Sequence, residues 1–475
     1  MSQIFHSRVK PITKLTAVSS NPSVSGRVYP LSAADHALAR HSAAVVMYYS
    51  ENPFGSFILD PMRESLSKVL TLYPTVTGRL TRTENGNWAV KGNDAGVRVT
   101  MTKVGSSLDE WLRSADSVEE RDLAAFDEMP EDPYIWSPFR IQINEFEGGG
   151  VAIGVSFTHL IADPTSATFL LKTWADAHRG GPVSPPLFTK PSSLGDGEKI
   201  PNIATKSTSF YANKSKLDNH IVSPTKMSSV TFKFSNTTIN QCLSKIKPHC
   251  PNATPFDFLA SLFWKQILKI KSNSPNSEHN NNNNNNHSLS ICSDIRNSFQ
   301  SSNSQRCYFG NALHISQLTI DPKEMEQHEL GQIVELVHNH LERLGEEEEE
   351  TWSAMEWLES QKEKDGKYVM PFKMYGPELS CVSMEHMMMM MKKGNDNESL
   401  SYATKFVKDS KPVHVSYNIG NVEGEGLIIV MPSNEGGVAR NVVVMLPSER
   451  EVDELCEDQA ILSFNPTMIL GGRHK

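Results

Sequence analysis

The sequence of 475 residues is poor in the features that mark secreted, membrane-spanning and metal-binding proteins. Its only six cysteines, at 242, 250, 292, 307, 381 and 456, lack the close pairing that a disulfide framework or a zinc site needs. No apolar run reaches the roughly 18 residues of a membrane span. The N-terminal stretch MSQIFHSRVKPITKLTAVSS has no continuous apolar core, so it does not resemble a secretory signal. We therefore expect buried, reduced thiols, no metal, no transmembrane segment and a cytoplasmic location.

An excess of basic charge is also missing. The chain has 46 Lys and Arg against 55 Asp and Glu, which gives a net charge of -9. Such a mildly acidic protein has no general reason to bind nucleic acid or anionic membranes. The hydrophobic fraction of 38% is enough for a sizeable core, and the length fits two or three globular domains.

A Pro-, Gly- and Ser-rich stretch at 180–202 divides the chain and is typical of a linker. We expect an N-terminal domain at 1–180, a crossover linker at 181–224 and a C-terminal domain at 225–475. Both halves mix strand-like and helix-like segments, which predicts α/β layering in each.

Three low-complexity runs interrupt the second half. Asn280–Asn286 and Met387–Met391 show neither a strand nor a helix period, so they are expected to be loop insertions. Glu346–Glu350 is expected to continue a solvated helix face.

Local patterns predict several elements. Ser32 and Asp35 have the spacing of a helix N-cap and its reciprocal partner. Apolar residues between 62 and 73 recur at helical intervals. Residues 87–104 suggest a hairpin that turns at 93–96, and 426–433 with 439–447 suggest paired strands.

The most informative stretch is VAIGVSFTHLIADPTSATFLLKTWADA, which begins at Val151. The alternation from Val151 to Phe157 predicts a strand, and the spacing after Pro164 predicts a helix. Asp163 is a favoured N-cap and Pro164 a favoured first helical residue. Helix capping alone explains Asp163 as well as a role in chemistry does.

His159 lies between that strand and that helix. An imidazole can accept a proton near neutral pH, because its ordinary pKa is about 6.5. The spacing His-x-x-x-Asp is weak by itself in a chain with 16 histidines. Taken alone, His159 is more often a satisfied core or loop residue, so its surroundings must decide.

Those surroundings resemble the HxxxD motif of the plant BAHD acyltransferases. Further matches occur along almost the whole chain in the order of that family, and several ordered matches are much more specific than one. They are YPLSAADHA (29–37), LSKVLTLYPTVTGRL (66–80), NDAGVRV (93–99), HLIADPTS (159–166), PFDFLASLFWKQ (255–266), SDIR (293–296), YFGNA (308–312) and GEGLIIVMPSNEGGV (424–438).

The resemblance implies a fold and a mechanism. The fold would be α/β, with two chloramphenicol-acetyltransferase-like domains, each a mixed sheet with flanking helices, joined by a long crossover. The family implies a monomer with a solvent channel between its domains, which acyl-CoA and an alcohol or amine acceptor enter from opposite faces. His159 would deprotonate the acceptor and Asp163 would support the loop. Acyl-CoA is a co-substrate here, so no cofactor is expected.

Two further matches place residues near that channel. Asp294 and Arg296 fit the D-x-R element of the family, although a local ion pair explains them equally well. Tyr308, Gly310 and Asn311 fit its YFGN element, although a simple turn would also account for them.

One motif of the family is degenerate. The stretch at 404–416, TKFVKDSKPVHVS, stands where the family has DFGWGKP, and only Lys411 and Pro412 match. This loss, together with the C-terminal runs at 416–433 and 441–455, resembles the eceriferum-type subgroup. That subgroup implies an accessory role in very-long-chain fatty acid elongation for cuticular wax, with an elongase condensing enzyme as partner at the endoplasmic reticulum.

Two hypotheses therefore stand. The first is an acyl-CoA-dependent acyltransferase with His159 as general base, which needs neither a metal nor a covalent acyl-enzyme. The second is a weakly catalytic or non-catalytic accessory protein of fatty acid elongation. A hydrolase is disfavoured because the sequence has no G-x-S-x-G nucleophile elbow.

Overall fold

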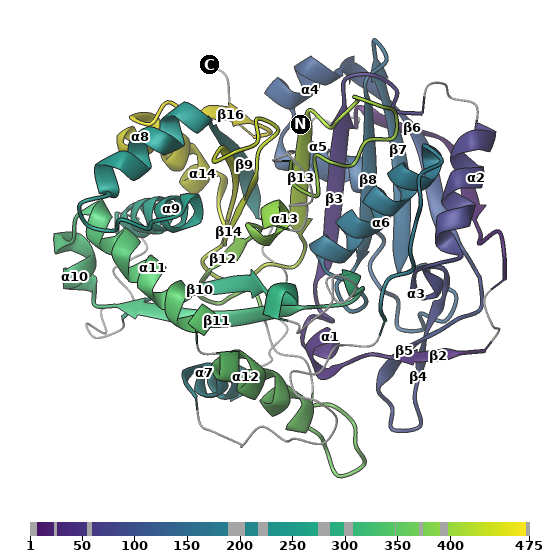
Figure 1. Ribbon diagram of the computed structural model, residues 1–475, viewed down its shortest axis with the longest axis horizontal. Coiled ribbons are helices and arrows are strands. Elements are labelled where there is room, and N and C mark those ends of the chain that lie inside the picture. Colours follow the sequence, from purple (N-terminus) through teal and green to yellow (C-terminus); the bar gives the residue numbers. More distant parts are fainter. Residues whose placement is uncertain are drawn as a thin grey trace, which may run out of the picture.

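Figure 1 shows the computed structural model of the chain. It describes residues 7–22, 26–54, 59–188, 205–216, 227–273, 286–298, 307–346, 348–369, 374–389 and 398–471.

A six-stranded mixed sheet forms the core of the first lobe. Its strands β6 and β7 are parallel, and every other neighbouring pair is antiparallel. Helices α2 (Leu59–Leu70) and α6 (Pro164–His178) pack against each other beside it. In order across the sheet, the strands are β1 (Val9–Ala17), β6 (Val97–Ser107), β7 (Phe139–Glu147), β8 (Val151–Thr158), β3 (Ser42–Tyr49) and β13 (His414–Ile419).

A seven-stranded mixed sheet forms the second lobe, with helices gathered on its outer side (Figure 1). Its strand order is β11 (Leu313–Ile320), β10 (His287–Asp294), β12 (Leu379–Ser383), β14 (Leu427–Pro432), β15 (Arg440–Leu446), β9 (Ser228–Phe234) and β16 (Thr467–Ile469). The helices of this lobe include α8 (Asn236–Ile246), α9 (Pro255–Ser272), α10 (Pro322–Gln327), α11 (Leu330–Glu346), α14 (Glu449–Cys456) and α15 (Gln459–Leu462).

Shorter elements complete the chain. A three-stranded sheet is formed by β2 (Val28–Pro30), β5 (Trp88–Lys91) and β4 (Arg79–Arg82). The remaining helices are α1 (Ala33–Ala37), α3 (Pro74–Thr77), α4 (Leu108–Ser114), α5 (Ser117–Arg121), a 3₁₀ turn (Asp122–Ala124), α7 (Lys206–Lys216), α12 (Glu348–Ser360), a 3₁₀ turn (Arg296–Ser298) and α13 (His386–Met389).

The expected α/β class with two mixed, helix-flanked sheets is confirmed. One strand crosses the expected domain boundary, because β13 comes from the second half of the sequence but pairs with β3 in the first sheet. Figure 1 shows β13 standing beside β3. The degenerate stretch 404–416 runs into this strand, so it lies where the two lobes are joined.

Several local predictions are confirmed. Ser32 caps α1, and its side chain and that of Asp35 bond reciprocally to the helix backbone. Asp163 caps α6 with Pro164 in the first turn. Strands β14 and β15 pair as expected.

Other local predictions are wrong. Residues 87–104 form no hairpin, because β5 pairs with β2 and β4 whereas β6 pairs with β1 and β7. The glutamate run is helical as expected at Glu348–Glu350, and Glu349 is exposed, but Glu350 is buried and accepts a hydrogen bond from the backbone N–H of Ser207 at 3.0 Å. Met387 is buried in a short helix rather than in a loop. Cys307 is exposed, unlike the buried thiol that was expected.

For parts of the low-complexity runs and of the linker, the predictions cannot be compared with the structure. Residues 280–285 and 390–391 of the asparagine and methionine runs lie outside the described residues, as does most of the linker at 189–204.

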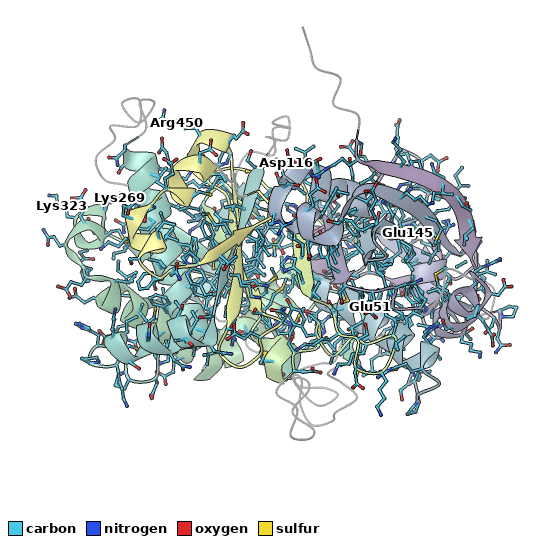
Figure 2. All side chains as sticks on the ribbon, turned by 90° about the horizontal axis from the view of Figure 1, so that it is seen from above. Glu51, Asp116, Glu145, Lys269, Lys323 and Arg450 are labelled. Carbon is cyan, nitrogen blue, oxygen red and sulfur yellow. The ribbon has the colours of Figure 1, made fainter. Side chains whose placement is uncertain are left out.

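Charged side chains lie on the periphery of both lobes. Figure 2 labels Lys269, Lys323 and Arg450 at the outer surface of the second lobe, and all three are exposed. Of the helices in the described part of the chain, none is long and apolar enough to cross a membrane.

Strand β8 is central in its sheet, and all eight of its residues are buried. It has β7 on one side and β3 on the other, while the turn at Asp122–Ala124 packs against its face. A strand covered on both faces needs no polar face, so its sequence is almost wholly apolar or small. Because β8 is central and buried, the residue that follows it lies in the interior of the protein.

Gly154 allows that close packing. A Cβ at Gly154 would lie 2.0 Å from the carbonyl oxygen of Leu123. We expect Gly154→Ala to lower the free energy of unfolding by about 1–3 kcal/mol, because backbone must move to admit the methyl group. Gly345 in α11 has open space, so Gly345→Ala should be neutral or slightly stabilising in the same urea titration. Equal stability of the two variants would contradict this packing.

Candidate active site

His159 directly follows β8 and lies wholly inside the protein. Its side chain is 0% exposed. Its backbone N–H donates to the carbonyl oxygen of His41 at 2.9 Å, which ties it to the residue that precedes β3. The backbone of His159 is therefore tied to the residue before the adjacent strand β3 rather than lying in a free loop.

The neighbours of Asn311 fix the tautomer of His159. The Asn311 Nδ2 amino group donates to Asp35 Oδ1 at 2.8 Å and to the His159 carbonyl oxygen at 2.7 Å. Because a carbonyl oxygen can only accept, the other amide atom of Asn311 must be its oxygen. That oxygen lies 3.0 Å from His159 Nδ1, so Nδ1 carries the proton in the neutral ring.

The second ring nitrogen is then a hydrogen-bond acceptor. His159 Nε2 lies 3.3 Å from the Tyr375 hydroxyl, which can donate to its lone pair. Burial lowers the pKa of His159 below the ordinary 6.5, outweighing the charge of Asp163 that raises it. At neutral pH the site therefore holds an unprotonated Nε2 facing a hydroxyl group, which is the state that a general base requires.

Asp163 does not orient the His159 ring but pairs with Arg296. Arg296 Nη1 lies 2.9 Å from Asp163 Oδ2, and both side chains are 0% exposed. Arg296 also contacts Asp294 and donates from Nη2 to the carbonyl oxygen of Gly310 at 2.9 Å. Burial alone would raise the pKa of Asp163, but the Arg296 charge and its hydrogen bonds hold that pKa below its usual value.

This network ties α6 to the second lobe. Ser166, in the first turn of α6, donates to the Gly310 carbonyl oxygen at 2.9 Å and accepts from Arg296 Nη2 at 2.9 Å. The Ala312 N–H donates to Asp163 Oδ2 at 3.0 Å, and Arg296 Nε donates to the Tyr308 carbonyl oxygen at 3.1 Å. The residues that carry the D-x-R, YFGN and HxxxD matches thus meet at one interface.

The seven predicted residues fall into two groups. Asn311 joins His159, whereas Asp163, Asp294, Arg296, Tyr308 and Gly310 form the ion-pair network beside it. Three residues of this site, Asp35, Tyr375 and His41, were not predicted from the sequence. The first belongs to the YPLSAADHA match but was assigned only a capping role, and no local pattern marks the other two.

In the described part of the chain, the His159 side chain lines none of the three described cavities, so the expected channel beside its ring is not seen there. A cavity of about 730 Å³ lies between the lobes and is lined by Met227 and Met445 on one side. On the other side it reaches His41 and Thr158, the immediate neighbours of His159, but the His159 side chain does not line it. The hydroxyl of Tyr375 instead covers Nε2, so an acceptor would have to displace it.

Protonation of His159 is expected to set the low-pH limit of any acyl-transfer activity. Because burial lowers the pKa of His159 below 6.5, the ring is half protonated only at a pH below that value. We expect kcat/KM to fall in acid, with the midpoint of the fall below about pH 6.5. A midpoint at or above pH 7 would contradict this assignment.

No group of three His, Cys, Asp or Glu side chains that could hold a metal ion occurs among the residues with described placement.

The family model described as "Transferase family" matches residues 8–458. Protein ECERIFERUM 2 of Arabidopsis thaliana is 24% identical over 460 residues, which cover 92% of this chain and 96% of that protein. Protein ECERIFERUM 26-like of the same species is 26% identical over 264 residues and is matched over only 61% of its length.

Solved structures share the fold. Vinorine synthase superposes with a TM-score of 0.65 at 18% identity, covering 94% of this chain and 96% of that one. F. graminearum TRI101 complexed with coenzyme A and deoxynivalenol superposes with a TM-score of 0.64 at 16% identity, covering 94% and 100%. With the family model spanning nearly its whole length, the chain belongs to the transferase family of BAHD acyltransferases, among which it has ECERIFERUM relatives.

Proposed function

We propose that this protein transfers an acyl group from acyl-CoA to the hydroxyl or amino group of a small molecule, with His159 as the general base. One observation carries the proposal. A buried, neutral imidazole presents an unprotonated Nε2 to a hydroxyl donor, Tyr375, which occupies the position that an acceptor hydroxyl would take.

The reaction needs few groups. Nε2 of His159 takes the proton of the acceptor as its oxygen or nitrogen attacks the thioester carbonyl, and CoA leaves as the thiol after receiving a proton. Asn311 keeps the ring in the required tautomer through Nδ1. Asp163 and Arg296 hold the loop and α6 in place without touching the reacting atoms. Coenzyme A in a structural neighbour of the same fold supports acyl-CoA as the donor.

A product assay tests this proposal. The purified protein is incubated with acyl-CoAs of increasing chain length and a panel of alcohols and amines, and products are identified by mass spectrometry. The proposal predicts a new ester or amide, with one free CoA released for each product molecule. Failure to form a product with any pair, while acyl-CoA binds in calorimetry, would refute it.

A second candidate is an accessory role in fatty acid elongation, acting with an elongase condensing enzyme at the endoplasmic reticulum. Two observations favour it: Tyr375 covers Nε2 of His159, and the match with ECERIFERUM 2 extends over 96% of that protein. Co-expression with a condensing enzyme in a heterologous host separates the two candidates. Longer fatty acids formed equally by the wild type and by His159→Ala would support the accessory role.

A further inference from the structure

Lys214 is a buried lysine of α7, the helix inside the predicted crossover linker. Its side chain is 3% exposed, and its Nζ lies 2.9 Å from Glu378 Oε1. Glu378 also accepts a hydrogen bond from the Ser290 hydroxyl on β10. A buried lysine is rare unless its charge is paired, so the groups that Lys214 binds indicate what it holds in place.

Lys214 also binds the backbone on both sides of Tyr375. Its Nζ donates to the carbonyl oxygen of Met374 at 3.0 Å and to that of Gly376 at 2.6 Å. Hydrogen bonds from a charged donor are roughly twice as strong as neutral ones. One ammonium group therefore fixes the two residues that flank Tyr375.

The alternate carbonyl groups of this segment bond to main chain instead. Those of Tyr375 and Pro377 accept from the backbone N–H groups of Glu423 and Glu425 at 3.4 and 2.8 Å. Such main-chain bonds do not depend on the side chains present, whereas those of Lys214 do. Lys214 is thus a side chain through which the sequence can set how firmly the segment is held.

The segment held in this way presents the Tyr375 hydroxyl to His159. Tyr375 is 1% exposed, and its hydroxyl lies 3.3 Å from His159 Nε2 and has a side-chain hydrogen bond with the Cys292 thiol. While the hydroxyl donates to the lone pair of Nε2, that nitrogen cannot take a proton from another molecule. The Tyr375 hydroxyl must therefore move before the imidazole can act as a base.

We propose that Lys214 is a positioning residue, which acts through Tyr375 and keeps Nε2 of His159 covered until a substrate displaces the hydroxyl. The Lys214–Glu378 ion pair and the two carbonyl bonds of Lys214 together form a latch on the closed site. The open form is then a minor population, and a substrate binds with an affinity that is reduced in proportion to the open fraction.

The latch is tested by the reaction of His159 with diethyl pyrocarbonate, which modifies neutral, accessible imidazole nitrogens. Peptide mass spectrometry follows each histidine separately, without any substrate. In the wild type, His159 should react at least about tenfold more slowly than the exposed His249, because it reacts only when the site opens. Equal rates at the two residues would overturn the proposal.

Variants of the latch should open the site. Lys214→Met combined with Glu378→Gln removes both charges of the pair, so that neither is left buried alone. We expect His159 to react about tenfold faster than in the wild type, because the closed form loses the hydrogen bonds of a charged donor. Glu378→Gln alone keeps the two carbonyl bonds and should give a smaller rise of about threefold. Lys216→Met changes an exposed lysine of the same helix and should keep the wild-type rate.

His414 is the internal control for general loosening of the protein. It is 3% exposed and lies on β13 in the first sheet, so its rate should stay unchanged in every variant. A His159 rate within about twofold of wild type in the double variant, or an equal rise at His414, would overturn the latch. If circular dichroism shows that the double variant is unfolded, the same comparison in Glu378→Gln decides.

Turnover gives a second readout, and this part alone rests on the proposed function. Opening the latch should lower KM for the acceptor by about tenfold and leave kcat unchanged, because more molecules are open before the acceptor binds. A lower kcat with an unchanged KM would show that Lys214 only supports the fold. Faster modification of His159 without any product would refute the proposed function alone, whereas product formation with unchanged modification rates would refute the latch alone.

Discussion

Replacing His159 by alanine is expected to lower the rate of acyl transfer by about 10²- to 10⁴-fold, the usual contribution of a positioned general base. The variant loses the unprotonated nitrogen that lies 3.3 Å from the Tyr375 hydroxyl, which also has a side-chain hydrogen bond with the Cys292 thiol. The rate of free CoA release, measured with a thiol reagent, checks the prediction.

The matched control for this experiment is another histidine of the same chain. His249 is exposed in the second lobe, so His249→Ala should keep the wild-type rate. A His159→Ala rate within about threefold of wild type would mean that the proton leaves the acceptor by another route.

The second large effect is expected at Arg296. Arg296→Met leaves Asp163 and Asp294 buried without their cation, and breaking a buried ion pair from one side typically costs about 3–5 kcal/mol. Urea-induced unfolding measures the loss. Lys68→Met is the control, because Lys68 pairs with Glu64 at the surface, with 59% and 69% of the two side chains exposed. That change should leave the urea midpoint of unfolding close to the wild-type value, because exposed ion pairs contribute little.

The difference in the free energy of unfolding between wild type and Arg296→Met should depend on pH, because the pKa of Asp163 is lowered in the folded protein. Arg296 holds the pKa of Asp163 below its unfolded value, so the stabilisation is present above that unfolded value, about 3.9. It is lost as the pH falls through the lower folded-state pKa. The gap between wild type and Arg296→Met should therefore shrink below about pH 4. A gap that widened in acid would show that Asp163 is not the partner that matters.

Much of the site could be predicted because its key elements are local. A small-residue strand, His159, an N-cap at Asp163 and a helix follow one another within about 30 residues, and each has a clear signature. His159 and Asn311 could each be singled out as site residues, because both lie in motifs of the family. Their contact itself was not predictable from spacing, since tertiary folding alone brings the two segments together.

The rest depends on packing between distant segments. Tyr375 covers Nε2 of His159 from a part of the chain with no recognisable pattern, so the closure of the site was not foreseen. The hairpin at 87–104 failed because alternation identifies strands but not their partners, and β5 and β6 belong to different sheets. Glu350 was assigned to solvent from composition, whereas α7 covers it through Ser207.

The protonation of the His159 ring is tested most directly by ¹⁵N NMR of protein labelled at histidine. Subtracting the spectrum of His159→Ala isolates the two ring nitrogens of this residue. We expect a protonated Nδ1 and a mainly unprotonated Nε2 from pH 8 to pH 7, because burial lowers the pKa of His159 below 6.5. A proton on Nε2, or protons on both nitrogens in that range, would remove the base on which the proposed chemistry depends.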